Sequence, residues 1–176
     1  HCQRSFLSES NGGRLAPAVV LQYQIYYDMR TKQTIAVIGA SGSMGAAISK
    51  SLSKGNYRLL LFTDDKGKLK NLEKEIINAH PGADVESINC SYTASWEADV
   101  IIVAAPFAAE KEIAGKIREV ANQKIVVSIA NPLNDSFDGL VTPPDTSAAE
   151  ELQKLLPHSK VIKAFNTTFA ADFAQP

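Results

Sequence analysis

The chain has 176 residues, of which 45% are hydrophobic and 21% are charged, and its formal net charge is -1. This is the composition of an ordinary globular domain with a full core. It excludes the basic excess of nucleic-acid-binding proteins, and no apolar run approaches the roughly 20 residues of a membrane-spanning helix. Cys2 and Cys90 form no Cys-x-x-Cys motif, and no histidine pair has the spacing of metal ligands. We therefore expect a cytoplasmic protein that uses no metal and binds neither nucleic acid nor membrane.

Residues 1–28 differ from the rest of the chain in composition. Asn11, Gly12 and Gly13 form a flexible break, and the apolar stretch that follows is interrupted by Gln22 and Gln24. This pattern lacks the clean apolar run and cleavage site of a signal peptide. We expect residues 1–28 to be a non-native or disordered leader and residues 29–176 to form one domain, with a genuine N-terminal element as the alternative.

From residue 34 onward, strand and helix patterns alternate along the chain. Apolar runs predict strands at residues 34–38, 57–62, 84–88, 99–104, 124–129 and 160–164. Helical spacing predicts helices at residues 43–54, 66–79 and 107–121, and a capping box at Ser147 opens another. Six short strands separated by helices predict an α/β fold: a Rossmann-type doubly wound parallel sheet with strand order 3-2-1-4-5-6.

A glycine-rich turn joins the first predicted strand to the first predicted helix. Its spacing is Gly-x-x-Gly-x-x-Gly, and it lies where the strand order reverses and ligands bind in such sheets. Glycines allow the tight turn and the close approach of a phosphate, which the helix N-terminus attracts. A glycine-rich turn without a ligand is the alternative. The predicted dinucleotide-binding residues of the turn are Gly39, Ala40, Ser41, Gly42, Ser43, Met44 and Gly45.

The end of the second predicted strand carries conflicting signals about the cofactor. An acidic residue here binds the ribose 2′-hydroxyl of NAD, whereas basic or hydroxyl groups accommodate the 2′-phosphate of NADP. Asp64 or Asp65 favours NAD, and Thr63, Lys66 and Lys68 favour NADP. Either aspartate equally fits the N-cap and first turn of the helix that begins there.

Two further segments end at the same edge of the predicted sheet. Ala104, Ala105 and Pro106 end the fourth strand, where small residues let a cofactor lie close to the backbone, although the proline equally marks a simple strand stop. Asn131 ends the fifth strand, and a proline- and glycine-rich loop follows to residue 145. Loops of this length are usually functional or disordered. We interpret it as a lid over a nicotinamide or, equally, as a solvated surface loop.

No residue is identified as a catalytic acid, base or nucleophile. No tyrosine is followed four residues later by lysine, and no Ser/His/Asp or Cys/His arrangement is present. Hydride transfer between two redox cofactors requires none, because the cofactors carry the chemistry and the protein orients them.

Four stretches together resemble the deazaflavin-dependent NADP reductase family, which includes the reductase domain of the STEAP metalloreductases. The stretches are residues 35–45, 98–106, 124–132 and 147–173. The glycine spacing and residues 163–167, Lys-Ala-Phe-Asn-Thr, are the most specific parts. The resemblance implies NADP(H) bound by the glycine turn, a 2′-phosphate site after the second strand, and nicotinamide contacts near Ala105, Pro106 and the end of the fifth strand.

The chain departs from that family pattern in two places. Asp64 stands where the family commonly has a phosphate-binding arginine, although Thr63 and Lys68 match its hydroxyl and lysine positions. NADP remains the favoured cofactor, with NAD as the alternative. Family members continue for some tens of residues past Thr167, so we expect the chain to be truncated at its C-terminus.

These observations predict an NADP(H)-binding oxidoreductase that transfers hydride between nicotinamide and a flavin-like or deazaflavin acceptor. Two alternatives stay open: a non-catalytic dinucleotide-binding redox sensor or regulatory module, and the cofactor domain of a dehydrogenase without its substrate domain. The expected partner is a small-molecule or flavin-like electron acceptor, and a homodimer is left open.

Overall fold

A computed structural model of the chain describes residues 32–134, 136 and 138–174. The predicted leader at residues 1–28 lies outside these described residues. No helix in the described part of the chain is both long enough and apolar enough to span a membrane. The elements, in chain order, are β1 (Gln33–Ile38), α2 (Ser43–Leu52), β2 (Tyr57–Phe62), α3 (Lys66–Ala79), β3 (Asp84–Ser87), α4 (Ser91–Glu97), β4 (Val100–Val103), α5 (Phe107–Ile117), β5 (Ile125–Ser128), α6 (Ala148–Leu155), β6 (Lys160–Lys163) and the 3-10 helix η1 (Ala170–Ala174).

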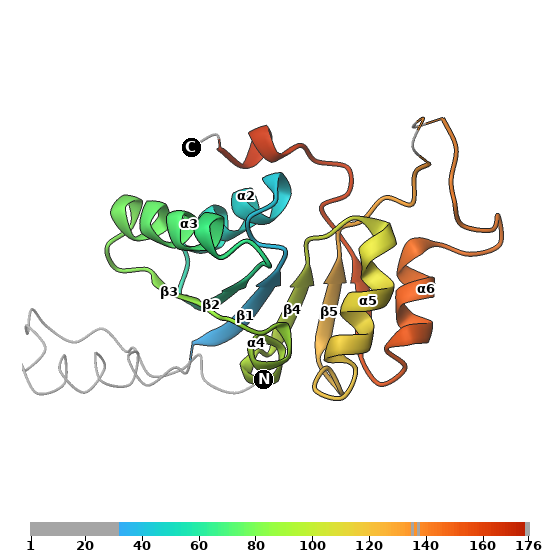
Figure 1. The fold of residues 1–176 in the computed structure, drawn as a ribbon, viewed down its shortest axis with the longest axis horizontal. Helices are drawn as coiled ribbons and strands as arrows, with labels where there is room; N and C mark the ends of the chain where they lie inside the picture. The colour runs from blue at the N-terminus through green and yellow to red at the C-terminus, as the bar shows by residue number, and fades with distance from the viewer. Residues whose placement is uncertain (1–31, 135, 137, 175–176) are drawn as a thin grey trace, which may run out of the picture. The chain divides into compact units, whose positions relative to one another are not determined.

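The six strands form one parallel sheet in the order β3-β2-β1-β4-β5-β6 (Figure 1). This confirms the predicted Rossmann-type doubly wound sheet and its strand order. Because the order reverses between β1 and β4, the connections that leave their carboxyl ends diverge to opposite faces. The glycine turn after β1 lies at this point.

The helices bury a separate apolar core on each face of the sheet. On one face, α2 contributes Ile48 and α3 contributes Leu69, Leu72 and Ile76. On the other face, α4, α5 and α6 supply the apolar side chains of Ala94, Ala114, Ile117, Leu152 and Leu156. The middle of β2, residues 59–61, is fully buried, as expected for a strand covered on both faces.

Two helices in the described part of the chain are not predicted from the sequence, the α-helix α4 and the 3-10 helix η1. The 7 residues of α4 are too few to show an apolar period, and Cys90 at its N-cap makes no side-chain hydrogen bond. The connection from β3 to β4 is nevertheless a parallel crossover, which requires about a dozen residues and usually contains a helix. A helix between β3 and β4 could therefore have been predicted from the parallel crossover alone.

Several predicted boundaries are wrong by one to four residues. The helices predicted to reach residues 54 and 121 end at Leu52 and Ile117. The chain there tightens into turns, in which the Val120 N–H donates to the Ile117 carbonyl at 3.0 Å. The later predicted strands lose terminal residues because these bond to neighbours outside the regular ladder, as the Ile88 N–H does to the Leu61 carbonyl at 2.8 Å.

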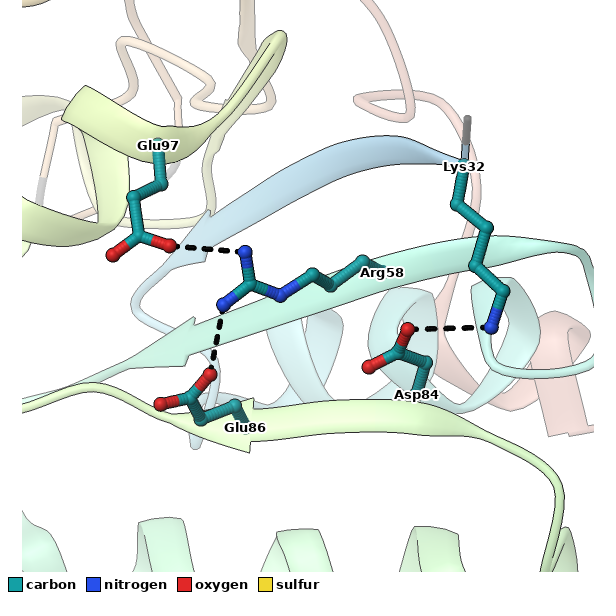
Figure 2. Close-up of polar contacts among 5 residues, drawn as sticks. All are labelled: Lys32, Arg58, Asp84, Glu86 and Glu97. Carbon is teal, nitrogen blue, oxygen red and sulfur yellow. Dashed lines mark hydrogen bonds and ion pairs between the residues drawn. The ribbon is translucent and has the colours of Figure 1, made fainter. Parts of the chain in front are cut away.

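Exposed ion pairs join the strands of the first half of the sheet near their amino ends. Figure 2 shows the Arg58 guanidinium between the carboxylates of Glu86 and Glu97, each 3.0 Å away. Lys32 Nζ lies 3.2 Å from Asp84 Oδ2. The Arg58 pairs connect β2 with β3 and α4, and the Lys32 pair connects the start of β1 with β3, away from the carboxyl edge where the glycine turn lies.

After β6 the chain reverses and returns to α2. Phe165 adopts a φ of 62°, which is uncommon for a bulky residue. Its ring packs edge-to-face on Phe173, with centroids 5.7 Å apart. The C-terminal segment, red in Figure 1, thus brings η1 against α2. Residues 163–167, the Lys-Ala-Phe-Asn-Thr stretch, form this reversal.

Candidate functional site

The turn between β1 and α2 requires glycine at two of its three glycine positions. Gly39 has a φ of +87°, and a Cβ there would collide with the carbonyl oxygen of Ala104. A Cβ on Gly45 would collide with the carbonyl oxygen of Gly39, so α2 could not approach β1 as closely. Both glycines therefore allow close backbone packing at the carboxyl edge of the sheet.

Gly42 leaves the start of α2 open. It is the N-cap residue, its φ of -67° suits any side chain, and no side chain caps the helix. The first N–H groups of a helix lack intrahelical acceptors, and the positive end of the helix dipole attracts anions. The turn thus has the two features of an anion site at a helix N-terminus.

The end of β2 separates the roles of the two aspartates. Asp65 is the N-cap of α3, and its carboxylate accepts from the Lys68 N–H at 3.0 Å. The backbone hydrogen bond from Lys68 is the main reason that the pKa of the Asp65 carboxyl is lowered. Asp64 instead faces a cavity beside the glycine turn. Close by, Ser41 Oγ and Thr63 Oγ1 form a hydrogen bond of 2.9 Å.

That cavity has a volume of about 330 Å³, at the lower end of the range for small-molecule sites. The glycine turn, the ends of β2 and β4, and one side of α5 form its walls. Its lining residues are Ile38, Gly39, Ser41, Gly42, Phe62, Thr63, Asp64, Ser91, Ala104, Ala105, Pro106, Ala109, Glu112, Ile113 and Lys116.

Eight of the predicted cofactor-binding residues line this cavity: Gly39, Ser41, Gly42, Thr63, Asp64, Ala104, Ala105 and Pro106. Residues from three separate segments of the sequence thus meet at one place. The other predicted residues of the turn, Ala40, Ser43, Met44 and Gly45, are not among the lining residues. Ala40 and Gly45 are instead buried in the packing of the turn.

Two other predicted residues lie away from the cavity. Lys68 Nζ pairs with Asp65 Oδ2 at 3.3 Å, and the Lys68 side chain is 71% exposed. Asn131 Nδ2 donates to the Asn166 carbonyl at 3.0 Å, which connects the segment after β5 to the segment after β6. Their predicted contacts with a cofactor remain predictions.

One face of α5 contributes lining residues that the sequence reading did not select. Ala109, Glu112, Ile113 and Lys116 follow the i, i+3, i+4, i+7 spacing of a single helix face. Because α5 begins directly after Pro106, this spacing was a usable signal. Ser91, at the start of α4, also lines the cavity, but α4 itself was not predicted.

The α5 face places charge at the rim of the cavity. Lys116 Nζ lies 2.6 Å from Glu112 Oε1, with side-chain exposures of 50% and 73%. The hydrogen bond between them raises the pKa of Lys116 and lowers the pKa of Glu112. The negative charge of Asp64 is a smaller cause that also raises the pKa of Lys116.

The loop after β5 folds back on itself. An isolated antiparallel bridge joins Leu133 to Leu140, and the Val141 N–H donates to the Pro132 carbonyl at 2.8 Å. Leu140 is 65% exposed, and none of these residues lines the cavity. The interpretation of this loop as a lid therefore remains a prediction.

Comparisons with known proteins identify the family to which the chain belongs. A family model described as "NADP oxidoreductase coenzyme F420-dependent" matches residues 34–132, more than half of the chain. An F420-dependent NADP reductase of Methanocaldococcus jannaschii is 32% identical over 138 residues, which cover 74% of this chain and 61% of that protein. A glycerol-3-phosphate dehydrogenase (NAD(P)+) of Thermoanaerobacter sp. is 24% identical over 151 residues, which cover 75% of this chain and 46% of that protein.

Solved structures include a similar fold. A candidate F420-dependent NADP reductase from Arthrobacter sp. FB24 matches with a TM-score of 0.65 and 25% identity, covering 78% of this chain and 64% of that chain. The chain therefore spans less than two thirds of the length of each of these three proteins.

Proposed function

Because the chain belongs to the family described as NADP oxidoreductase coenzyme F420-dependent, we propose that it binds NADP(H) beside the glycine turn and transfers hydride between the nicotinamide and a deazaflavin acceptor. The observation that carries this proposal is the cavity that joins the open N-terminus of α2 to the end of β2. The similarity to an F420-dependent NADP reductase supports a deazaflavin as the acceptor.

The residues around the cavity suit the adenosine and phosphate portion of such a cofactor. The N-terminus of α2, with Gly42 at its N-cap, would hold the pyrophosphate. The hydroxyls of Ser41 and Thr63, 2.9 Å apart, would donate to anionic oxygens at the end of β2. Ala105 and Pro106 present little bulk, so the second half of the cofactor can lie near the backbone.

The chemistry of the reaction would belong to the cofactors. A bound nicotinamide supplies the carbon that gives or receives hydride, and the protein orients it and excludes competing reactions. The charged residues that line the cavity, Asp64, Glu112 and Lys116, need no acid or base role if hydride passes between two redox cofactors.

Ligand-induced stabilisation tests the binding step. NADPH and NADH are titrated against the full chain, and thermal unfolding is followed at saturation. At 100 times its Kd, a nucleotide that binds only the folded state stabilises it by about 2.7 kcal/mol. We expect stabilisation by NADPH. If neither nucleotide binds or stabilises the chain, the proposed function is wrong.

Two substitutions at one position test where the phosphates bind. Gly42→Asp and Gly42→Asn both supply a good N-cap side chain, and the Cβ of either would lie 3.3 Å from the Gly39 carbonyl oxygen, so both are expected to affect α2 equally. Only the aspartate adds negative charge where the pyrophosphate would lie. We expect at least tenfold weaker NADPH binding for Gly42→Asp than for Gly42→Asn. Equal affinities would place the phosphates elsewhere.

Turnover separates the enzyme from a non-catalytic dinucleotide-binding module. Oxidation of NADPH is followed by its absorbance in the presence of coenzyme F420, and separately with FAD and FMN. We expect NADPH oxidation with the deazaflavin. Tight NADPH binding without turnover on any of the three acceptors would instead favour the redox-sensor alternative.

A further inference from the structure

Three charged side chains lie at the rim of the cavity, and only one of them is positive. Asp64 follows the end of β2, whereas Glu112 and Lys116 occupy one face of α5. Among the described residues that line the cavity, Lys116 is the one cationic side chain. Any anionic group that enters beside Thr63 and Asp64 therefore meets its countercharge on α5.

Lys68, the lysine that was predicted from the sequence to bind the 2′-phosphate, has a different environment. Lys68 pairs with the capping carboxylate of Asp65, 3.3 Å away, and does not line the cavity. Asp65 is itself occupied, because it accepts from the Lys68 backbone N–H. The segment after β2 thus presents Thr63 and the carboxylate of Asp64 to the cavity but no cation.

We propose that Lys116 recognises the 2′-phosphate of NADP(H), exchanging its partner Glu112 for the phosphate when the nucleotide binds. This inference rests on the proposed function. Lys116 shares the cavity with Thr63 and Asp64, at the end of β2 where the adenosine ribose of a dinucleotide lies in this fold. An ammonium on a flexible stem acts as a mobile point charge, so it can reorient from a carboxylate to a phosphate.

The present partner of Lys116 is weakly held enough to be replaced. Glu112 and Lys116 form an exposed i,i+4 pair, a class of ion pair that contributes little to stability. A phosphate monoester carries close to two negative charges at neutral pH and offers three strong acceptor oxygens, whereas the carboxylate carries one charge. The phosphate is therefore the stronger partner for Lys116.

Asp64 favours NADH, whereas Lys116 favours NADPH. Its carboxylate can accept from a ribose 2′-hydroxyl and repels a 2′-phosphate. The preference between the two nucleotides thus depends on the balance between Lys116 on α5 and the two carboxylates of Asp64 and Glu112. Removing one charge from either side is expected to move the preference in opposite directions.

The test measures Kd values of the full chain for NADPH and NADH, with three single variants. Lys116→Met keeps the alkyl stem and removes the charge, and it is expected to weaken NADPH binding at least tenfold while NADH binding changes less than twofold. Glu112→Gln removes the competing carboxylate and is expected to tighten NADPH binding severalfold without affecting NADH. Lys111→Met removes an exposed lysine of the same helix that does not line the cavity, and it serves as the matched control with unchanged affinities.

The outcomes distinguish this inference from the proposed function. If the unmodified chain binds neither nucleotide, the proposed function fails, and this inference fails with it. If the chain binds NADPH but Lys116→Met weakens NADPH and NADH equally, or weakens neither, only the role of Lys116 is overturned. A selective loss of NADPH affinity in a fourth variant, Lys68→Met, would instead place the phosphate site at the start of α3. Because Lys116 is half exposed, unfolding curves of all three variants are expected to match the unmodified chain.

Discussion

The two halves of the sheet place their charged residues in opposite environments. The first half is β1 to β3 with the helices that follow these strands, and the second half is β4 to β6 with α5 and α6. In the first half, Arg58 on β2 donates to Glu86 and Glu97 in pairs that solvent reaches, and 36% of the Arg58 side chain is exposed. In the second half, Glu110 on α5 is only 2% exposed, and it accepts from the Ser128 hydroxyl at 2.6 Å. Both sets of contacts connect neighbouring elements, but water solvates only the Arg58 pairs, because Glu110 and Ser128 are buried.

Glu110, Ser128 and Lys163 form a buried cluster, and incomplete pairing also distinguishes it from the exposed pairs of Arg58. Ser128 and Lys163 are register partners at the ends of β5 and β6. Within the described part of the chain, Glu110 Oε2 and Lys163 Nζ are buried and have no hydrogen-bond partner. A buried polar atom without a partner costs free energy, whereas an exposed one is solvated by water. The second half therefore contains buried charged groups whose pairing is incomplete, whereas the Arg58 pairs of the first half are exposed.

The first half instead depends on backbone geometry, and Gly39→Ala tests this most severely. The left-handed φ of +87° and the collision of a Cβ with the Ala104 carbonyl both oppose the substitution. We expect a loss of about 3 kcal/mol in the free energy of unfolding, measured by urea denaturation. Gly82→Ala is the matched control, because a Cβ there meets nothing within 4 Å. Equal losses in both variants would contradict the backbone argument.

Glu110→Ala is expected to have the next largest effect. It removes the acceptor of the buried Ser128 hydroxyl and a negative charge that attracts Lys163. We expect a loss of about 2 kcal/mol in the free energy of unfolding. Glu112→Ala, two residues further along α5 on its exposed side, is the control and should leave stability unchanged. A neutral Glu110→Ala would mean that the buried cluster does not stabilise the second half.

The pH dependence of stability tests how burial affects the Glu110 carboxyl. Burial is the main cause that raises the pKa of the Glu110 carboxyl above its ordinary value of 4.5, while Ser128 and Lys163 lower it. A raised pKa means that the folded state holds the proton more tightly than the unfolded state. The resulting stabilisation is complete below pH 4.5 and is lost as the pH rises through the folded-state pKa. Glu110→Gln does not titrate, so the stability of the unmodified chain relative to this variant should fall over that range.

The opposite pH dependence of this stability difference would lead to a different conclusion. If the unmodified chain gains stability relative to Glu110→Gln as the pH rises from 4.5, attraction by Lys163 outweighs the burial of the carboxylate. Urea denaturation at a series of pH values distinguishes the two cases.

The first half of the sheet was also the more predictable from sequence. The bounds of β2 and α3 are confirmed, because each is a single apolar pattern with clear turn residues at its ends. The role of Asp65 could not be separated from that of Asp64, since both fit a cap and a ribose contact until the backbone hydrogen bond from Lys68 is seen.

The second half shows what sequence patterns cannot reveal. Glu110 looks like an ordinary exposed helical charge, and its burial follows only from the packing of α5 on the end of β5. The position of Lys116 beside Thr63 and Asp64 likewise depends on how α5 lies against the end of β2. Local spacing predicted the elements, and tertiary packing decided which charges meet.

Ser147→Ala tests a local, exposed interaction in the second half. Ser147 Oγ accepts from the Glu150 N–H at 3.3 Å, and Glu150 Oε2 accepts from the Ser147 N–H at 2.7 Å, as the predicted capping box requires. Loss of this cap is expected to reduce the free energy of unfolding by about 1 kcal/mol. Ser147→Asp keeps a capping oxygen and should retain most of the stability. If aspartate and alanine destabilise equally, the cap contributes nothing to α6.

Arg58→Met tests the smallest effect and completes the comparison with Glu110. Methionine preserves the apolar stem that lies along β2 and removes the two exposed ion pairs with Glu86 and Glu97. Exposed pairs of this kind contribute about 0.5 kcal/mol each at most, and salt screens them. We therefore expect a loss of under about 1 kcal/mol at low salt that shrinks at high salt, whereas the loss in Glu110→Ala should persist because its charge is shielded from ions. A loss in Arg58→Met that is as large and as insensitive to salt as that of Glu110→Ala would show that burial does not distinguish the charges of the two halves.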